Sequence, residues 1–362
     1  MGKAFLSHAD AARLNRNIVL HYVKDRQPVS RTDIWDSMSI SRASVTQVIR
    51  QLQESDWIVE AEECESNGGR RPRNLRFNDN ARFAYVFEWN RHRICLANMG
   101  GEILESRTLS FPQSCTPAAF SAIVSDGIQA LRVARPVEPD RLLGLGLALP
   151  GLIDSRNTTV LFSVELGWRD VDIRRLFSES FGRNVFLERT GNVIALGEYV
   201  SGAAKGFEHV LLVLMGNEGI GASAVVHGDC QHGSNYMYGE LGHIKLSASR
   251  VICSCGQQGC LEATVRDHLM RNGGQFDSQL IDYLSFGVST AVNLSDPGIV
   301  LLAGRLVQGL DSKSEQALLA SIRGKITNER SRSMILHLCG DNADMGVKGM
   351  CAHIFNNWFS VK

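Results

Sequence analysis

Residues 239–264, GELGHIKLSASRVICSCGQQGCLEAT, gather one histidine and three cysteines within 18 positions. Thiolate and imidazole together suit zinc, and four protein ligands complete a tetrahedron without leaving a position for a catalytic water. Gly256 and Gly259 fit a tight turn around a metal, because glycine tolerates backbone angles that a side chain forbids. The alternative is three buried thiols beside a core histidine. The stretch therefore predicts one structural zinc ion per chain, with four ligands: His243, Cys253, Cys255 and Cys260.

Two carboxylates flank these ligands, Glu240 just before the histidine and Glu262 just after the last cysteine. The pattern GExGH followed by CxCGxxGCLE resembles the signature of the ROK family, which comprises repressors, uncharacterised reading frames and sugar kinases. The resemblance implies that His243, Glu240 and Glu262 face a bound sugar, while the metal fixes the loop that carries them.

The composition is that of an ordinary globular protein, with 44% hydrophobic and 21% charged residues over 362 positions and a formal net charge of zero. That length predicts two or three domains. No apolar run is long enough to span a bilayer, and the N-terminus lacks the apolar core of a signal peptide. Nine cysteines, an odd number, favour a reducing compartment over a disulfide framework. We therefore expect a cytoplasmic protein without a membrane anchor. Because the net charge is zero, a DNA-binding role has to be indicated by a local cluster of positive charge.

Residues 1–80 predict a winged helix-turn-helix domain. A first helix ends at Gln27-Pro28, a capping box at Ser30 begins a second, and Ser41 begins a third. The apolar positions that define the first helix are Leu14, Ile18, Tyr22 and Val23. Those of the second are Ile34, Trp35 and Met38, and those of the third are Val45, Val48, Ile49 and Leu52.

The opposite face of the third helix carries short polar groups and arginines, which suit the reading of a major groove. A solvated helix face is the alternative. The residues assigned to DNA on this helix are Arg42, Ser44, Thr46, Gln47 and Arg50.

Two short strands, 57–59 and 75–77, follow the third helix and predict a wing. Its tip places Arg70 and Arg71 beside two glycines, a cationic finger suited to phosphates or to a narrow minor groove. Residues 1–80 hold 12 lysines and arginines against 11 aspartates and glutamates, so the positive charge is local to the wing. The stretches SRTDIWDSMSISRASVTQVIRQL and GGRRP resemble the repressor branch of the ROK family, which includes regulators for N-acetylglucosamine, glucose and xylose.

From Ala81 onward, strands alternate with helices and glycine turns, which predicts an α/β architecture. The family resemblance, rather than the pattern, implies a two-lobed actin-like fold of the sugar kinase and heat-shock ATPase type. We expect a first lobe over 81–190, joined by a C-terminal helix at 340–362, and a second lobe over 191–339. The second lobe would carry the zinc loop and an oligomerisation surface, in a homodimer or a homotetramer.

Two family motifs of the sugar kinases are altered here. Where the kinases carry a DxGGTK phosphate loop, this chain reads FEWNRHRIC, whose bulky Trp89 and Arg91 would block a phosphate. Where they carry ENDAN, this chain has Thr190 in place of the aspartate that serves as general base, and a threonine hydroxyl is no base near neutral pH. We therefore expect no catalytic residues and no enzyme activity, with a sugar kinase of atypical active site as the alternative.

The altered ENDAN motif also places Arg189 where the kinases have an asparagine that binds sugar hydroxyls. Its permanent charge and planar fork of donors favour a carboxylate or phosphate. The expected effector is therefore a sugar acid or a sugar phosphate, with six binding residues: Glu240, His243, Glu262, Arg189, Asn192 and Gly151.

The sequence as a whole predicts a DNA-binding transcriptional regulator of carbohydrate genes, a repressor that responds to a sugar derivative. In one alternative Arg189 pairs with an acid and closes the site, leaving no small-molecule ligand. In another the regulator is controlled by a protein partner.

Overall fold

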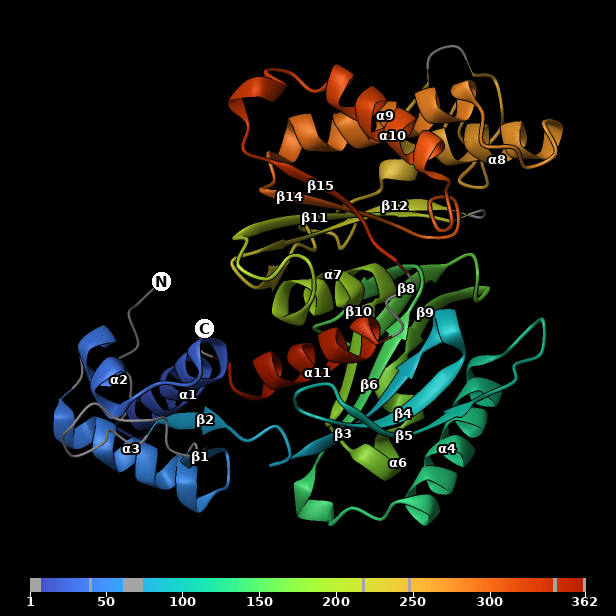
Figure 1. Cartoon of the computed structure of the whole chain (residues 1–362). Helices are drawn as coiled ribbons and strands as arrows, with labels where there is room; N and C mark the ends of the chain where they lie inside the picture. The colour runs from blue at the N-terminus through green and yellow to red at the C-terminus, as the bar shows by residue number, and fades with distance from the viewer. Residues whose placement is uncertain are drawn as a thin grey trace, which may run out of the picture.

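The chain is described by a computed structural model over residues 8–38, 41–60, 74–216, 219–246, 249–340 and 344–360. Three helices, α1 (His8–Arg26), α2 (Arg31–Ser37) and α3 (Arg42–Glu54), lie together at one end of the molecule (Figure 1). The predicted capping box is present. The Ser30 hydroxyl accepts a hydrogen bond from the Asp33 backbone N–H, and the Asp33 carboxylate accepts one from the Ser30 backbone N–H. Ser41 caps α3, whose buried face is the predicted one.

The buried face of α1 differs from the prediction. Val19, Leu20 and Val23 are fully buried, whereas Ile18 is 38% exposed. Successive residues of an α-helix are rotated by about 100° around its axis. Two neighbouring rows of apolar residues can therefore show the same helical spacing in the sequence, although only one row faces the core. Packing against α3 and β2 selects the stripe through Val19 and Val23.

The two predicted strands of the wing pair antiparallel, as β1 (Ile58–Glu60) and β2 (Leu75–Phe77). Ile58 lies opposite Phe77, and both are buried. The predicted wing tip with Arg70 and Arg71 lies outside the described residues.

Among the residues described after β2, two five-stranded sheets form the centre of the structure, and both have the same topology. In each sheet three consecutive strands form an antiparallel meander, and two later strands add in parallel beside the first. The first sheet contains β3 (Phe83–Glu88), β4 (Arg93–Asn98), β5 (Ile103–Thr108), β6 (Leu142–Leu149) and β10 (Val185–Arg189). The second contains β11 (His209–Met215), β12 (Ile220–Val226), β13 (Asp229–Cys230), β14 (Ile299–Ala303) and β15 (Ile335–Leu338). This repeated order is the doubled α/β architecture that the resemblance implied.

Helices cover both sheets. Near the first sheet are α4 (Pro117–Ala134), α5 (Ile173–Leu176) and α6 (Ser178–Phe181), with a small sheet of β7 (Leu152–Asp154), β8 (Thr159–Ser163) and β9 (Trp168–Asp172). On the outer side of the second sheet are α8 (Leu261–Arg271), α9 (Ser278–Ser295) and α10 (Ser312–Lys325) (Figure 1). Within the described ranges, none of the helices combines the length and the apolar character needed to cross a membrane.

Two helices connect these parts. α7 (Thr190–Ser201) follows β10 directly and packs against the C-terminal helix α11 (Met345–Trp358). The backbones approach so closely that a Cβ on Gly349 would overlap the Val193 carbonyl, and one on Gly197 that of Met345. The other end of α11 enters the N-terminal core, where Phe355 meets Trp57 and Phe77. α11 therefore joins the helix-turn-helix end of the molecule to the first sheet (Figure 1).

Candidate metal centre and the junction between the two sheets

The four predicted metal ligands come together. One ligand atom from each of His243, Cys253, Cys255 and Cys260 lies within 4.8 Å of all the others. The Cys255 and Cys260 sulfurs are 3.7 Å apart, and Nδ1 of His243 is 3.7 Å from the Cys253 sulfur. Three sulfurs and one imidazole nitrogen at this spacing fit a tetrahedral zinc ion.

The loop that carries the thiols is shaped by the two predicted glycines. Gly256 and Gly259 have φ angles of +82° and +78°, in the region that side chains disfavour. At Gly259 a Cβ would also lie 2.9 Å from the Ser249 carbonyl oxygen. Between them, the Cys253 backbone N–H donates to Gln257 O and the Gly256 N–H donates to Cys253 O. These bonds close a tight turn over residues 253–257, which contains Cys253 and Cys255.

A charge that would balance the metal is also in place. Zinc with three thiolates and a neutral imidazole has a net charge of −1, because thiol ligands bind deprotonated. The ammonium group of Lys245 donates to the Cys260 sulfur at 3.1 Å. Lys245 therefore offsets the negative charge of the loaded site, which is a second feature that fits the metal.

His243 connects the metal ligands to the two glutamates. Its Nδ1 faces the thiols and lies 3.7 Å from Oε1 of Glu262, while its Nε2 lies 3.5 Å from Oε2 of Glu240. His243 ends the short 3-10 helix η3 (Leu241–His243), and Glu262 lies in the first turn of α8. Metal binding at Nδ1 would leave Nε2 directed at Glu240.

Arg189 reaches the second sheet from the end of β10. Its Nη2 donates to the backbone carbonyls of Tyr238 and Ala222, each at 2.9 Å. Its Nη1 has a longer contact, 3.4 Å, with Oε1 of Glu240. Oδ1 of Asn192 lies 3.4 Å from Nη2. Five of the six predicted effector residues thus form one connected group: Asn192, Arg189, Glu240, His243 and Glu262.

The sixth, Gly151, lies in the turn between β6 and β7. Its φ is +112°, and a Cβ there would lie 2.4 Å from the Phe162 carbonyl oxygen. The turn after β6 therefore needs glycine in order to pack against Phe162 and Ser163 of β8.

The sequence reasoning missed a polar cluster centred on Glu188, which precedes Arg189 and is fully buried. One carboxylate oxygen accepts from the Arg189 backbone N–H (2.7 Å) and from Asn192 Nδ2 (2.9 Å). The other accepts from Ser155 Oγ (3.0 Å) and pairs with His232 Nε2 (2.6 Å). His353 of α11 places its Nδ1 3.7 Å from the same oxygen.

The charges in this cluster follow from burial and pairing. Burial alone would raise the pKa of Glu188, but the hydrogen bond from His232 and the nearby His353 lower it to about 2. Burial opposes the charge on His232, yet its bond to Glu188 raises the His232 pKa. Burial lowers the pKa of His353. The contact with Glu188 thus favours the charged form of His232, whereas burial favours the neutral form of His353.

The residues at the two altered kinase motifs are packed against other parts of the protein. Glu88 is buried and accepts two hydrogen bonds from Arg93, at 2.7 and 3.1 Å, while Trp89 is also buried. The Thr190 hydroxyl is buried and has no hydrogen-bond partner among the described residues.

The predicted DNA-contacting residues of α3 are not equivalent. Gln47 is exposed, whereas Ser44 is half-buried and its backbone N–H donates to the Ser41 cap. The Thr46 hydroxyl donates to the Arg42 carbonyl, and Arg50 pairs with Glu54 at 2.7 Å. The Arg42 guanidinium lies over the Trp35 ring.

Comparisons with known proteins agree with this architecture. A model of the ROK family matches residues 90–272. The xylose repressor of Bacillus spizizenii is 25% identical over 342 residues, which cover 87% of this chain and 87% of the repressor.

Two solved structures show the same fold. A ROK family transcriptional regulator, a homolog of the E. coli MLC protein, has a TM-score of 0.75 at 21% identity and covers 95% of this chain and 96% of its own. The ROK hexokinase from Thermus thermophilus has a TM-score of 0.60 at 26% identity and covers 75% of this chain and 97% of its own. The regulator thus matches a larger part of this chain than the hexokinase does.

Proposed function

Because the chain belongs to the ROK family, we propose that it is a DNA-binding transcriptional regulator of carbohydrate metabolism genes, and specifically a repressor. The observation that carries the proposal is a helix-turn-helix, α2 and α3, followed by the strand pair β1 and β2, in one chain with the doubled ROK sheet. Homology to xylose repressors over 87% of the chain supports it. We keep residues 1–80 as the DNA-binding domain, 81–190 with α11 as one lobe, and 191–339 as the other.

The protein acts without catalysing phosphoryl transfer. Glu88 is engaged by Arg93, and Trp89, which stands in the motif that replaces the phosphate loop, is buried. Thr190 offers no general base, and the loss of such a group typically costs a hundred- to ten-thousand-fold in rate. The competing proposal is a sugar kinase of atypical active site. A panel of hexoses with ATP and magnesium separates the two, since the regulator consumes no ATP above background.

Zinc has a structural role in this proposal. One ion per chain, held by His243 and the three cysteines, fixes the loop between η3 and α8. It thereby sets the positions of Glu240 and Glu262, whose carboxylates flank His243. No open position is left for a reacting water.

DNA recognition combines base contacts from α3 with phosphate contacts from the wing. A single winged helix buries too little surface for high specificity, so we propose binding as a homodimer, or as pairs within a homotetramer, to two half-sites. Gln47 is exposed on α3, and we propose that its side chain contacts a base edge and so contributes to the base preference.

We expect the double substitution Arg70→Ala and Arg71→Ala to weaken binding to every DNA sequence, because the proposal assigns these two charges to DNA phosphates. The slope of log affinity against log salt should fall by about 2 for each domain. Gln47→Ala should instead change the preferred base at one position of each half-site. Selection of genomic fragments with purified protein, followed by salt titrations on the selected duplex, measures both effects.

The matched control is the pair Arg107→Ala and Arg135→Ala, which removes two exposed arginines from the first lobe, on β5 and just after α4 (Figure 1). It should leave binding and salt slope unchanged. A footprint that the Arg70 and Arg71 substitutions leave intact would show that the wing does not contact DNA.

The effector site consists of the connected group at the junction of the sheets. Arg189 already uses Nη2 on two carbonyls, whereas Nη1 has only the 3.4 Å contact with Glu240 among the described residues. A ligand carboxylate or phosphate can replace that contact, while Glu240 and Glu262 turn to sugar hydroxyls. The proposed effector is therefore a sugar acid or sugar phosphate.

Calorimetric titration tests the anionic effector. Wild-type protein should bind an acid or phosphate form at least about tenfold more tightly than the neutral sugar, and Arg189→Ala should lose that preference, because a hydrogen bond between two charged groups contributes on this scale. Arg183→Ala, a change of an exposed arginine before β10, should retain it.

Two results would redirect this proposal. Tight binding of a neutral sugar that survives Arg189→Ala would remove the anionic requirement. No heat with any ligand would favour the alternative in which Arg189, through Glu240 and the two carbonyls, permanently closes the site and a protein partner controls the regulator.

A further inference from the structure

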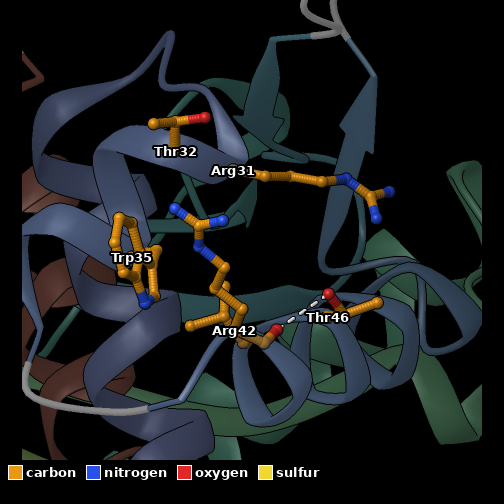
Figure 2. A pocket seen from close by; sticks show the side chains of 6 residues that line it. Arg31, Thr32, Trp35, Arg42 and Thr46 are labelled. Carbon is orange, nitrogen blue, oxygen red and sulfur yellow. Dashed lines mark hydrogen bonds between the residues drawn. The ribbon is translucent and has the colours of Figure 1, made fainter.

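A pocket lies between the two helices of the helix-turn-helix, away from the metal and effector groups. Figure 2 shows it from close by, with Arg31, Thr32 and Trp35 on the side of α2 and Arg42 and Thr46 on that of α3. Its remaining lining residue, Val45, belongs to the buried face of α3. The pocket is therefore an opening on the surface that is expected to face DNA, with an apolar floor and cationic walls.

Arg42 is held in this pocket by an aromatic ring. Its guanidinium carbon lies 3.9 Å from the centroid of the Trp35 ring, within the range of a stacked cation–π contact. In Figure 2 the Arg42 side chain rises from α3 toward α2 and ends beside Trp35. A free arginine side chain loses considerable rotamer entropy when it binds a ligand, and a stacked one has already lost part of it. Trp35 thus orders Arg42 before any ligand arrives.

Among the described residues, no acid is paired with Arg42. Its neighbours are paired, since Arg31 lies 3.8 Å from Glu60 and Arg50 lies 2.7 Å from Glu54. Within the described ranges, Arg42 takes part in no ion pair and its guanidinium contact is the Trp35 ring. In Figure 2 the Arg31 side chain extends away from Trp35, which leaves Arg42 as the cation beside that ring.

The direction in which the Arg42 side chain points favours contact with a backbone phosphate over contact with a base edge. In a helix-turn-helix the second helix enters the major groove, and the first helix crosses the sugar-phosphate backbone. Arg42 starts on the second helix, but its guanidinium leans toward the first. Residues that stay on the exposed face of α3, such as Gln47, remain available for base edges.

We propose that the α2–α3 pocket binds a backbone phosphodiester of the operator through Arg42, and that Trp35 is the positioning residue of that contact. The proposal rests on the proposed DNA-binding function and assigns Arg42 to affinity and register rather than to base recognition. A phosphate contact contributes equally on every sequence and adds to the salt dependence.

The test uses full-length protein and a duplex selected by the wild type from a random pool. Single linkages of this duplex are replaced, one at a time, by neutral methylphosphonate. At one linkage per half-site the replacement should weaken wild-type binding about tenfold. Arg42→Gln should bind the unmodified duplex about tenfold more weakly and lose nothing further at that linkage, while its base preferences stay unchanged. Arg50→Gln, on the same helix, should keep the full sensitivity there.

Trp35 is tested by the same linkage. Trp35→Leu should lose most of the sensitivity to methylphosphonate at that linkage, and Trp35→Phe, which keeps an aromatic face, should retain it. A role limited to packing would lower thermal stability without changing which linkage matters.

Three outcomes would overturn the proposal. In the first, Arg42→Gln keeps the full effect of methylphosphonate at every linkage. In the second, Arg42→Gln changes the selected base at one position. In the third, Trp35→Leu leaves binding fully sensitive to methylphosphonate at the linkage. In each of these cases wild-type DNA binding, and with it the proposed function, still stands. A wild-type protein that selects no duplex would instead refute both.

Discussion

Replacing Cys255 with serine should empty the metal site and strongly destabilise the region around the second sheet. Cys255 is exposed, so serine at this position removes almost no packing, and an ordinary surface change stays within about 0.5 kcal/mol. A structural zinc ion contributes far more, about 10–16 kcal/mol of binding free energy in small zinc domains. We expect the free energy of unfolding to fall by about 4 kcal/mol or more, the range typical of a lost metal.

Metal analysis and hydrogen exchange measure this effect. The wild type should contain about one zinc per chain and Cys255→Ser almost none. Amides of η3, the thiol loop and α8 should lose protection, while those of α1 to α3 should keep it. Gln257→Ala, an exposed change in the same loop, is the control and should preserve both metal and protection. An empty site in freshly purified wild-type protein that has never met a chelator would contradict the zinc assignment.

The metal centre was the part of the site most accessible to sequence reasoning, for a physical reason. Its ligands lie within 18 positions of the sequence, and the glycines between them indicate the tight turn that a short loop needs. The helix starts at Ser30 and Ser41 were also predictable, because a capping bond joins residues three positions apart.

The junction between the sheets could be predicted only in part. Arg189 stood in a recognisable motif, but its partners and those of the neighbouring Glu188 come from distant segments with no regular spacing. His232 follows β13, His353 lies on α11, and the carbonyls that hold Arg189 belong to residues 222 and 238. A backbone carbonyl has no signature in a sequence, so the anchoring of Arg189 required the fold.

The strand order shows the same limit. Alternating strands and helices predicted an α/β class, whereas the repeated meander with two parallel additions depends on which strands pair. Similarly, helical spacing on α1 was satisfied by Ile18 as well as by Val19, and only contacts with α3 and β2 decide which one is buried.

Replacing Phe355 with alanine should be the second change with a large effect, because this ring joins the DNA-binding end of the molecule to α11. Phe355 is fully buried, and its ring centroid lies 5.4 Å from that of Phe77 and 6.1 Å from that of Trp57. The Lys24 ammonium lies 4.8 Å above the Phe355 ring, and burial lowers the pKa of Lys24. Truncation would leave a cavity beneath a buried amine, so we expect a loss of about 3–5 kcal/mol in the free energy of unfolding.

Urea denaturation followed by circular dichroism measures this loss, and two variants calibrate it. Trp358→Ala removes a ring of the same helix that is 42% exposed, and it should cost much less. Phe355→Leu keeps most of the volume and should lose less than half as much. Equal costs for Phe355→Ala and Trp358→Ala would show that the α11 contact with the N-terminal core is not a stabilising interface.

Phe355→Leu also tests how effector binding is coupled to DNA binding in the proposed regulator. His353 and Phe355 are two residues apart on α11, one near Glu188 at the junction of the sheets and the other against Trp57. An effector that displaces the Arg189 and Glu188 contacts would therefore act on a helix whose far end is packed into the DNA-binding domain. If this helix carries the response, Phe355→Leu should still bind DNA and effector separately but show a smaller effect of effector on DNA affinity. An undiminished response in Phe355→Leu would place the coupling in another contact between the lobes and the helix-turn-helix.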